Sequence, residues 1–195
     1  MTVIVAVLKA LIALNSTLLA AGRVVAWMAL ALMVVVILTQ VWFRYVMGSA
    51  LNWPDEAARF LMLWMTGLIA PSAYRWGGFV AIDMVPAALG RAAGRSLNLL
   101  FLALSFAVLL TAVWFGWKHV NGGWLFGSST LKLPMHWFGG RPEALKLAWM
   151  YMSLWVGLVL LTLVNVELML REWVGLAAPD LEPPRDAEAL QVQAD

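Results

Sequence analysis

Cysteine is absent from the chain, and charged residues are scarce. The absence of cysteine excludes disulfides, thiolate metal sites, iron–sulfur clusters and a cysteine nucleophile. Only 12% of the 195 residues are charged, against about 25% in a typical soluble domain. The formal net charge of +2 comes without any basic stripe, so we expect no nucleic-acid partner. The shortage of charge argues against a surface made for water.

Apolar and aromatic residues fill the chain instead. Hydrophobic residues make up 63% of the sequence, and 12 residues are tryptophan. Tryptophan gathers at membrane–water interfaces, where its apolar ring and its N–H donor are both satisfied. This composition predicts an all-α integral membrane protein whose residues 1–174 form a single domain.

Four apolar runs are long enough to cross a bilayer, whose core of about 30 Å requires roughly 20 helical residues. Residues 79–96 are too polar to span, but their apolar positions recur every three or four residues. They predict a lateral amphipathic helix at the membrane surface. The predicted transmembrane helices cover approximately residues 24–43, 57–74, 97–117 and 144–170.

The two ends of the chain differ from these runs. Residues 1–22 are apolar but interrupted by Lys9 and by residues 15–17. They fit either a signal-like segment or a second lateral helix, and we favour the lateral helix because the apolar run is broken. Residues 175–195 are acidic and contain several prolines, which predicts a disordered cytoplasmic tail.

The second predicted span begins with a strong helix-start signal. Pro54 occupies the first helical position, and Asp55 and Glu56 lie in the first turn, where carboxylates interact favourably with the positive end of the helix. Arg59 follows Glu56 by three residues, so the two can form an ion pair. Glu56 could serve a proton or ion relay, or the pair could fix this span against a partner helix. We favour the structural pair, because one carboxylate near one membrane face makes no pathway.

Further charges lie after the second span and near the end of the last span. Arg75 and Asp83 bracket the turn after the second span. Arg75 could bind an anion, but we favour an interfacial arginine with Asp83 capping the lateral helix. Glu167 is four residues before Arg171, which predicts an ion pair near the end of the last span. No hydrolytic triad, metal-ligand cluster or phosphate loop is present, so we expect no enzyme activity, cofactor or bound metal.

The order of these motifs resembles the small membrane subunit, of DctQ-like or Q type, of tripartite ATP-independent periplasmic (TRAP) transporters. That family has an apolar span, a Glu-x-x-Arg helix start with a nearby Trp, an Arg-x-Gly turn, a lateral segment with Asp, and a Leu-x-x-Pro loop before the last span. The resemblance covers residues 24–172, with Phe79 where family members often have histidine. The matching positions are Glu56 and Arg59, Trp64, Arg75-Trp76-Gly77, Asp83, and Leu131 to Pro134.

The resemblance implies a scaffold subunit of a secondary transporter in the bacterial inner membrane, with both termini cytoplasmic. It implies a large elevator-type membrane subunit as partner, a periplasmic binding protein as transient partner, and sodium-coupled uptake of an organic acid. Sodium would bind the large subunit rather than this chain, which would contact that subunit and lipid. The candidate partner-interface residues are Trp53, Glu56, Arg59, Trp64, Arg75, Trp76, Asp83 and Pro134.

Two other classes of protein are weighed against the scaffold subunit. An independent homo-oligomeric transporter or channel needs polar residues aligned through the membrane, but the middles of the predicted spans are apolar. A membrane enzyme needs a nucleophile or metal cluster near an interface, and none is found. The polar residues within or beside the spans lie toward the span ends: Gln40, Glu56, Arg59 and Glu167.

Overall fold

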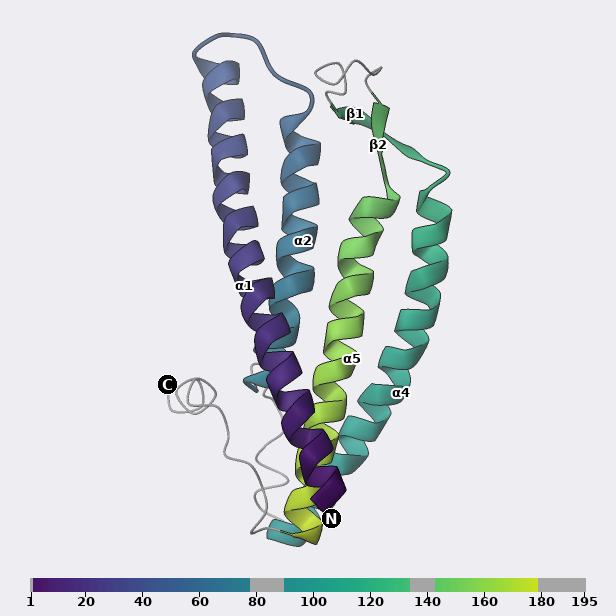
Figure 1. Ribbon diagram of the computed structural model, residues 1–195. Helices are drawn as coiled ribbons and strands as arrows, with labels where there is room; N and C mark the ends of the chain where they lie inside the picture. Colours follow the sequence, from purple (N-terminus) through teal and green to yellow (C-terminus); the bar gives the residue numbers. More distant parts are fainter. Residues whose placement is uncertain (1, 78–89, 134–142, 179–195) are drawn as a thin grey trace.

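Long helices lying side by side dominate the computed structural model, which describes residues 2–77, 90–133 and 143–178 (Figure 1). In space the helices follow the order α1, α2, α5, α4, and a small antiparallel hairpin of β1 and β2 covers one end. The helices α1 and α4 run in one direction, and α2 and α5 run in the other. The elements are α1 (Thr2–Tyr45), α2 (Pro54–Arg75), α4 (Arg91–Gly123), β1 (Gly127–Leu133), β2 (Glu143–Lys146) and α5 (Ala148–Ala177).

Three of the described helices, α1, α4 and α5, are long and apolar enough to cross a membrane. These three helices confirm the prediction of a helical membrane protein. The remaining predicted span, residues 57–74, is helical as part of α2. It is not among the three, because Asp55, Glu56, Arg59 and Arg75 make α2 more polar than its neighbours.

The N-terminal residues are not a separate lateral helix, because α1 runs without a break from Thr2 to Tyr45. Its buried positions are separated by three, four or seven residues, which is the 3.5-residue repeat of coiled-coil packing. One continuous seam therefore faces α2 and α5, and the polar residues near position 15 lie within it. The buried seam residues are Leu8, Asn15, Leu19, Gly22, Ala26, Ala29 and Val36.

The predicted bounds of the third and fourth spans also change. Residues 91–96, expected in the lateral helix, form the first turns of α4, which continues to Gly123. The expected loop before the last span contains the β1–β2 hairpin, whose cross-strand pairing is non-local and leaves no helical period to detect. Residues 144–146 are therefore strand, and α5 extends to Ala177. The predicted lateral helix over 79–89 and the tail over 179–195 lie outside the described residues.

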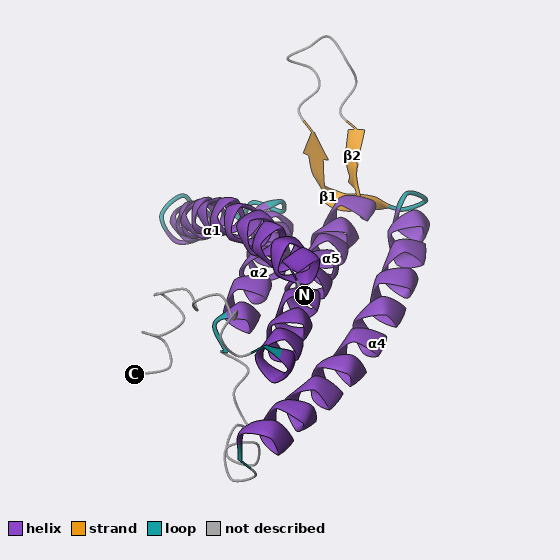
Figure 2. Ribbon diagram, turned by 60° about the horizontal axis from the view of Figure 1, so that its bottom comes forward, coloured by secondary structure: helices purple, strands orange, loops and turns teal. Residues whose placement is uncertain are grey.

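The helices α2 and α5 approach most closely at two glycines. A Cβ atom added to Gly67 would lie 2.4 Å from the carbonyl oxygen of Ser153, and one added to Gly157 would lie 2.6 Å from the carbonyl oxygen of Gly67. Backbone is thus in direct contact with backbone, as in small-residue packing between membrane helices. Figure 2 shows α4 on the opposite side of α5 from α1. The Trp155 Nε1–H of α5 donates to the Val113 carbonyl of α4 at 3.2 Å.

Candidate functional site

A fully buried carboxylate joins α1, α2 and α5 near the N-terminal end of α1. Glu167 Oε1 accepts hydrogen bonds from Arg75 Nε at 3.2 Å, from Arg75 Nη2 at 3.0 Å and from Arg171 Nε at 3.0 Å. Glu167 Oε2 accepts from Asn15 Nδ2 at 2.8 Å. The predicted pair of Glu167 with Arg171 is confirmed, but its carboxylate also binds two other helices.

Further hydrogen bonds extend this group. Arg75 Nη1 donates to Ser16 Oγ at 2.9 Å, and Asn165 Nδ2 donates to the Tyr74 hydroxyl at 2.7 Å. The side chains of Arg75 and Arg171 are only 7% and 10% exposed. We call the whole group the polar cluster: Asn15, Ser16, Tyr74, Arg75, Asn165, Glu167 and Arg171.

The polar cluster ties α1, α2 and α5 together. Its charged groups are the guanidinium groups of Arg75 and Arg171 and the carboxylate of Glu167. Because these groups are buried, removing one of them raises the free-energy cost of burying the others. Arg75 was predicted either as an anion site or as an interfacial cation. The anion beside it is Glu167, supplied by the chain itself. The arrangement is that of a structural clamp.

The predicted ion pair between Glu56 and Arg59 is wrong. Glu56 Oε2 accepts hydrogen bonds from the Thr130 backbone N–H at 3.2 Å and from the Thr130 hydroxyl, which attaches the hairpin to α2. Arg59 is exposed and has no hydrogen-bond or ion-pair partner among the described residues. Glu56 precedes the apolar part of α2, and the hydrogen bonds from Thr130 hold the pKa of its carboxyl below the usual value of 4.5. The residue whose hydrogen bonds stabilise the ionised form of Glu56 is therefore Thr130 on β1.

Replacing Glu56 with glutamine should loosen the hairpin while the bundle stays folded. The variant loses a charge-assisted acceptor, so amide hydrogen exchange at Thr130 should rise about five-fold or more. Because the folded-state pKa is lowered, the contact is fully present above pH 4.5 and is lost as the pH falls through the folded-state pKa. The E56Q variant should lack this pH dependence. Unchanged exchange in E56Q would show that the contact does not hold the hairpin.

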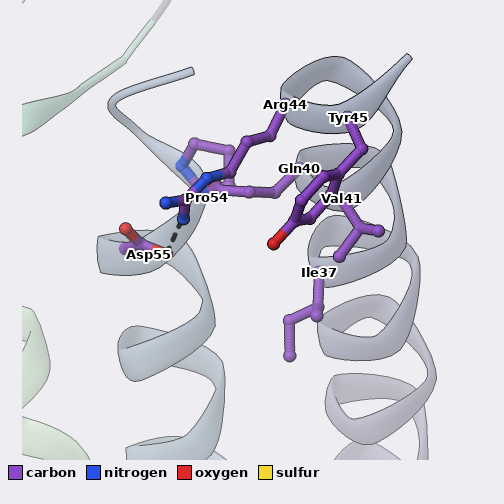
Figure 3. Close-up of a pocket in the computed structure, with 7 residues that line it drawn as sticks. All are labelled: Ile37, Gln40, Val41, Arg44, Tyr45, Pro54 and Asp55. Carbon is purple, nitrogen blue, oxygen red and sulfur yellow. Dashed lines mark hydrogen bonds between the residues drawn. The ribbon is translucent and has the colours of Figure 1, made fainter. Parts of the chain in front are cut away.

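A second polar site is a cavity of about 230 Å³ between the end of α1 and the start of α2 (Figure 3). Gln40 Nε2 donates to Asp55 Oδ1 across this gap at 3.1 Å. Gln40 Oε1 is buried and has no hydrogen-bond partner among the described residues. We call this cavity the α1–α2 pocket, and its lining residues are Ile37, Gln40, Val41, Arg44, Tyr45, Pro54 and Asp55.

The tryptophans predicted as partner contacts lie at different depths of α2. Trp53 is 40% exposed just before the helix. Trp64 is half-buried, and its Nε1–H has no acceptor within residues 2–77, 90–133 and 143–178. Trp76 follows the helix end, and the Arg23 guanidinium stacks over its ring at 4.9 Å. Asp83 and Pro134 lie outside the described residues, so their predicted roles stay predictions.

The sequence interpretation missed the two residues of the polar cluster that lie on α1. Asn15 and Ser16 interrupt the apolar run in the sequence, and in the structure they supply a donor to Glu167 and an acceptor to Arg75. A signal was available: with four spans, the N-terminal segment, Arg75 and Arg171 share one side of the membrane. Polar residues at span ends on the same side are candidates for mutual contact.

The long apolar helices indicate a membrane protein. Its buried charges bind one another and hold the helices together. The chain belongs to the DctQ component family of tripartite ATP-independent periplasmic transporters, whose sequence profile matches residues 33–175. It is therefore a small subunit of a TRAP transporter, a class of transporter component rather than of enzyme. A search of curated proteins gave no match. The resemblance inferred from the order of motifs is confirmed.

Proposed function

We propose that this chain is the scaffold subunit of a TRAP transporter and holds a large elevator-type membrane subunit at a fixed depth in the bilayer. The main support is the polar cluster, whose buried charges join α1, α2 and α5 instead of lining a pathway. An elevator needs one wall that stays still while the other part slides. A bundle clamped by buried ion pairs is suited to that task.

The remaining steps of transport fall to other chains in this proposal. A periplasmic binding protein delivers an organic acid, and the large subunit binds substrate and sodium. The chain lies in the bacterial inner membrane with both termini cytoplasmic. Its α2 forms a fourth crossing, which is supported by the position of α2 between the apolar helices α1 and α5 (Figure 1).

Arg59 marks the side of α2 that we assign to the large subunit. Inserting an arginine at the centre of a membrane helix costs about 2.5–3.5 kcal/mol, and less toward its ends. Because Arg59 is exposed and has no partner among the described residues, an acceptor on another chain would stabilise it. Met62, Leu63 and Thr66 are exposed at helical spacing from Arg59, so they share this face of α2.

Replacing Arg59 with alanine should weaken assembly rather than substrate recognition. We expect the amount of large subunit that co-purifies with R59A in mild detergent to fall about five-fold or more, because its acceptor loses the guanidinium. The apparent substrate affinity of the remaining complexes should be unchanged. Lys132→Ala, which removes an exposed cation from β1, is the matched control and should purify with the normal amount of partner.

Two outcomes of the same pull-down would contradict the proposal. An intact R59A complex with altered substrate affinity would refute the assignment of Arg59 to the interface. A chain that purifies alone or as a homo-oligomer, and still transports in liposomes, would replace the scaffold by an independent transporter. Intact wild-type complexes with a single large polytopic partner, identified by mass, would support the scaffold.

A further inference from the structure

The α1–α2 pocket opens where the membrane surface is expected. Trp42, Tyr45 and Trp53 surround this end of the two helices and are 59%, 77% and 40% exposed, as in an aromatic interface belt. Along α1, Gln40 lies 25 residues from Asn15 of the polar cluster, which is about 38 Å of helix. That separation exceeds the bilayer core of about 30 Å, so the pocket and the polar cluster fit opposite membrane faces.

The pocket brings hydrogen-bond donors and acceptors together without satisfying them. The Arg44 guanidinium faces the Tyr45 ring at 5.9 Å and makes no hydrogen bond or ion pair within the described residues. Gln40 Oε1 is buried and receives no hydrogen bond from the part of the chain that the structure describes, and the exposed Asp55 carboxylate accepts from Gln40 Nε2. Figure 3 shows Arg44 and Gln40 extending from α1 toward Asp55, with the Tyr45 hydroxyl directed into the gap. A cationic donor thus lies near the vacant Gln40 Oε1 and a carboxylate that accepts one hydrogen bond from Gln40.

We propose that the α1–α2 pocket binds the headgroup of phosphatidylethanolamine. The phosphate would interact with Arg44, and the primary ammonium would donate to Gln40 Oε1 and to Asp55. The start of the acyl chains would lie along the apolar side chains of Ile37 and Val41. In this arrangement Gln40 Oε1 receives the hydrogen bond that it lacks. The phosphate and the ammonium of one zwitterionic ligand pair with Arg44 and Asp55.

The size and chemistry of the pocket favour this ligand over other membrane lipids. Its volume of about 230 Å³ is below the range of about 300–1,000 Å³ that encloses a drug-sized ligand, which suits a headgroup whose acyl chains stay outside. Phosphatidylglycerol carries no cation for Asp55. Phosphatidylcholine carries a trimethylated ammonium, which has no N–H to donate to Gln40.

The test is a lipid titration of the purified, delipidated complex followed by native mass spectrometry. The probes are dioleoyl phosphatidylethanolamine, phosphatidylcholine and phosphatidylglycerol, added at equal concentrations. Phosphatidylethanolamine should bind about ten-fold more tightly than phosphatidylcholine, because only its ammonium forms the two hydrogen bonds. This comparison uses the unaltered protein, so it does not depend on how well any variant folds.

Variants assign the preference to this pocket. Gln40→Met should abolish the preference for phosphatidylethanolamine over phosphatidylcholine, and Arg44→Met should weaken the binding of both lipids. Lys118→Met, which removes another exposed cation beside an aromatic ring at the same end of the bundle, should change neither. Equal binding of the two zwitterionic lipids would overturn the proposal. Tighter binding of phosphatidylglycerol, or a preference retained in Q40M, would overturn it as well.

Discussion

Replacing Glu167 with alanine should lower the free energy of unfolding of the bundle by about 3–5 kcal/mol. The substitution removes the carboxylate that accepts hydrogen bonds from Arg75 and Arg171 and leaves both guanidinium groups buried without it. Asn15 loses its acceptor on α5 in the same step. Denaturant titration of the detergent-solubilised chain, followed by tryptophan fluorescence, would measure the change.

A charge-balanced variant separates loss of charge from loss of packing. Replacing Glu167, Arg75 and Arg171 together with methionine should restore most of the lost stability, because buried ionic groups are often replaced by apolar residues of similar volume without loss. Lys132→Gln, which alters an exposed cation on β1, should change stability by no more than about 0.5 kcal/mol. If the triple variant were as unstable as E167A, neutralisation of the arginines would not explain the effect.

Substituting alanine for Gly67 should separate α2 from α5 and destabilise the chain by about 3 kcal/mol, at the upper end of what overpacking usually costs. The added methyl group would meet the Ser153 carbonyl at 2.4 Å, and this neighbour is backbone, which cannot rotate away. Gly157→Ala should behave in the same way, because its Cβ would meet the Gly67 carbonyl at 2.6 Å. Thermal unfolding in mild detergent would report both losses.

Gly122→Ala is the matched control for these glycine variants. Gly122 lies in α4, and a Cβ added there meets nothing within 4 Å. The change should be neutral or stabilise the helix by about 0.5–1 kcal/mol, since glycine loses more backbone freedom than alanine on folding. Equal losses for Gly67→Ala and Gly122→Ala would show that the α2–α5 contact is not the cause.

Local patterns in the sequence predicted the elements whose causes are local. Pro54 and the acidic residues after it placed the start of α2, and the i,i+4 spacing placed Glu167 beside Arg171. Apolar runs longer than 20 residues identified the cores of α1, α4 and α5. These features depend on neighbours within one or two helical turns, which a single sequence displays directly.

Contacts between distant residues escaped the same reasoning. Asn15 looked like a break in an apolar helix because its partner Glu167 is 152 positions away. Glu56 pairs with Thr130, which is 74 positions away, and not with Arg59, the partner that local spacing predicts. In both cases the sequence shows the residue type. The partner of each residue depends on how the elements pack, and the local spacing of residues in the sequence does not reveal that packing.

The long interval between Asn15 and Glu167 also bears on how the chain is made. At synthesis rates of about 5–20 residues per second, the intervening 152 residues take about 8–30 s to appear. Arg75 is translated 92 residues before Glu167, so about 5–18 s pass before the carboxylate that neutralises it is made. The bundle cannot close from its N-terminal end as it emerges. It closes when α5 arrives, so α5 is the element whose insertion completes the subunit.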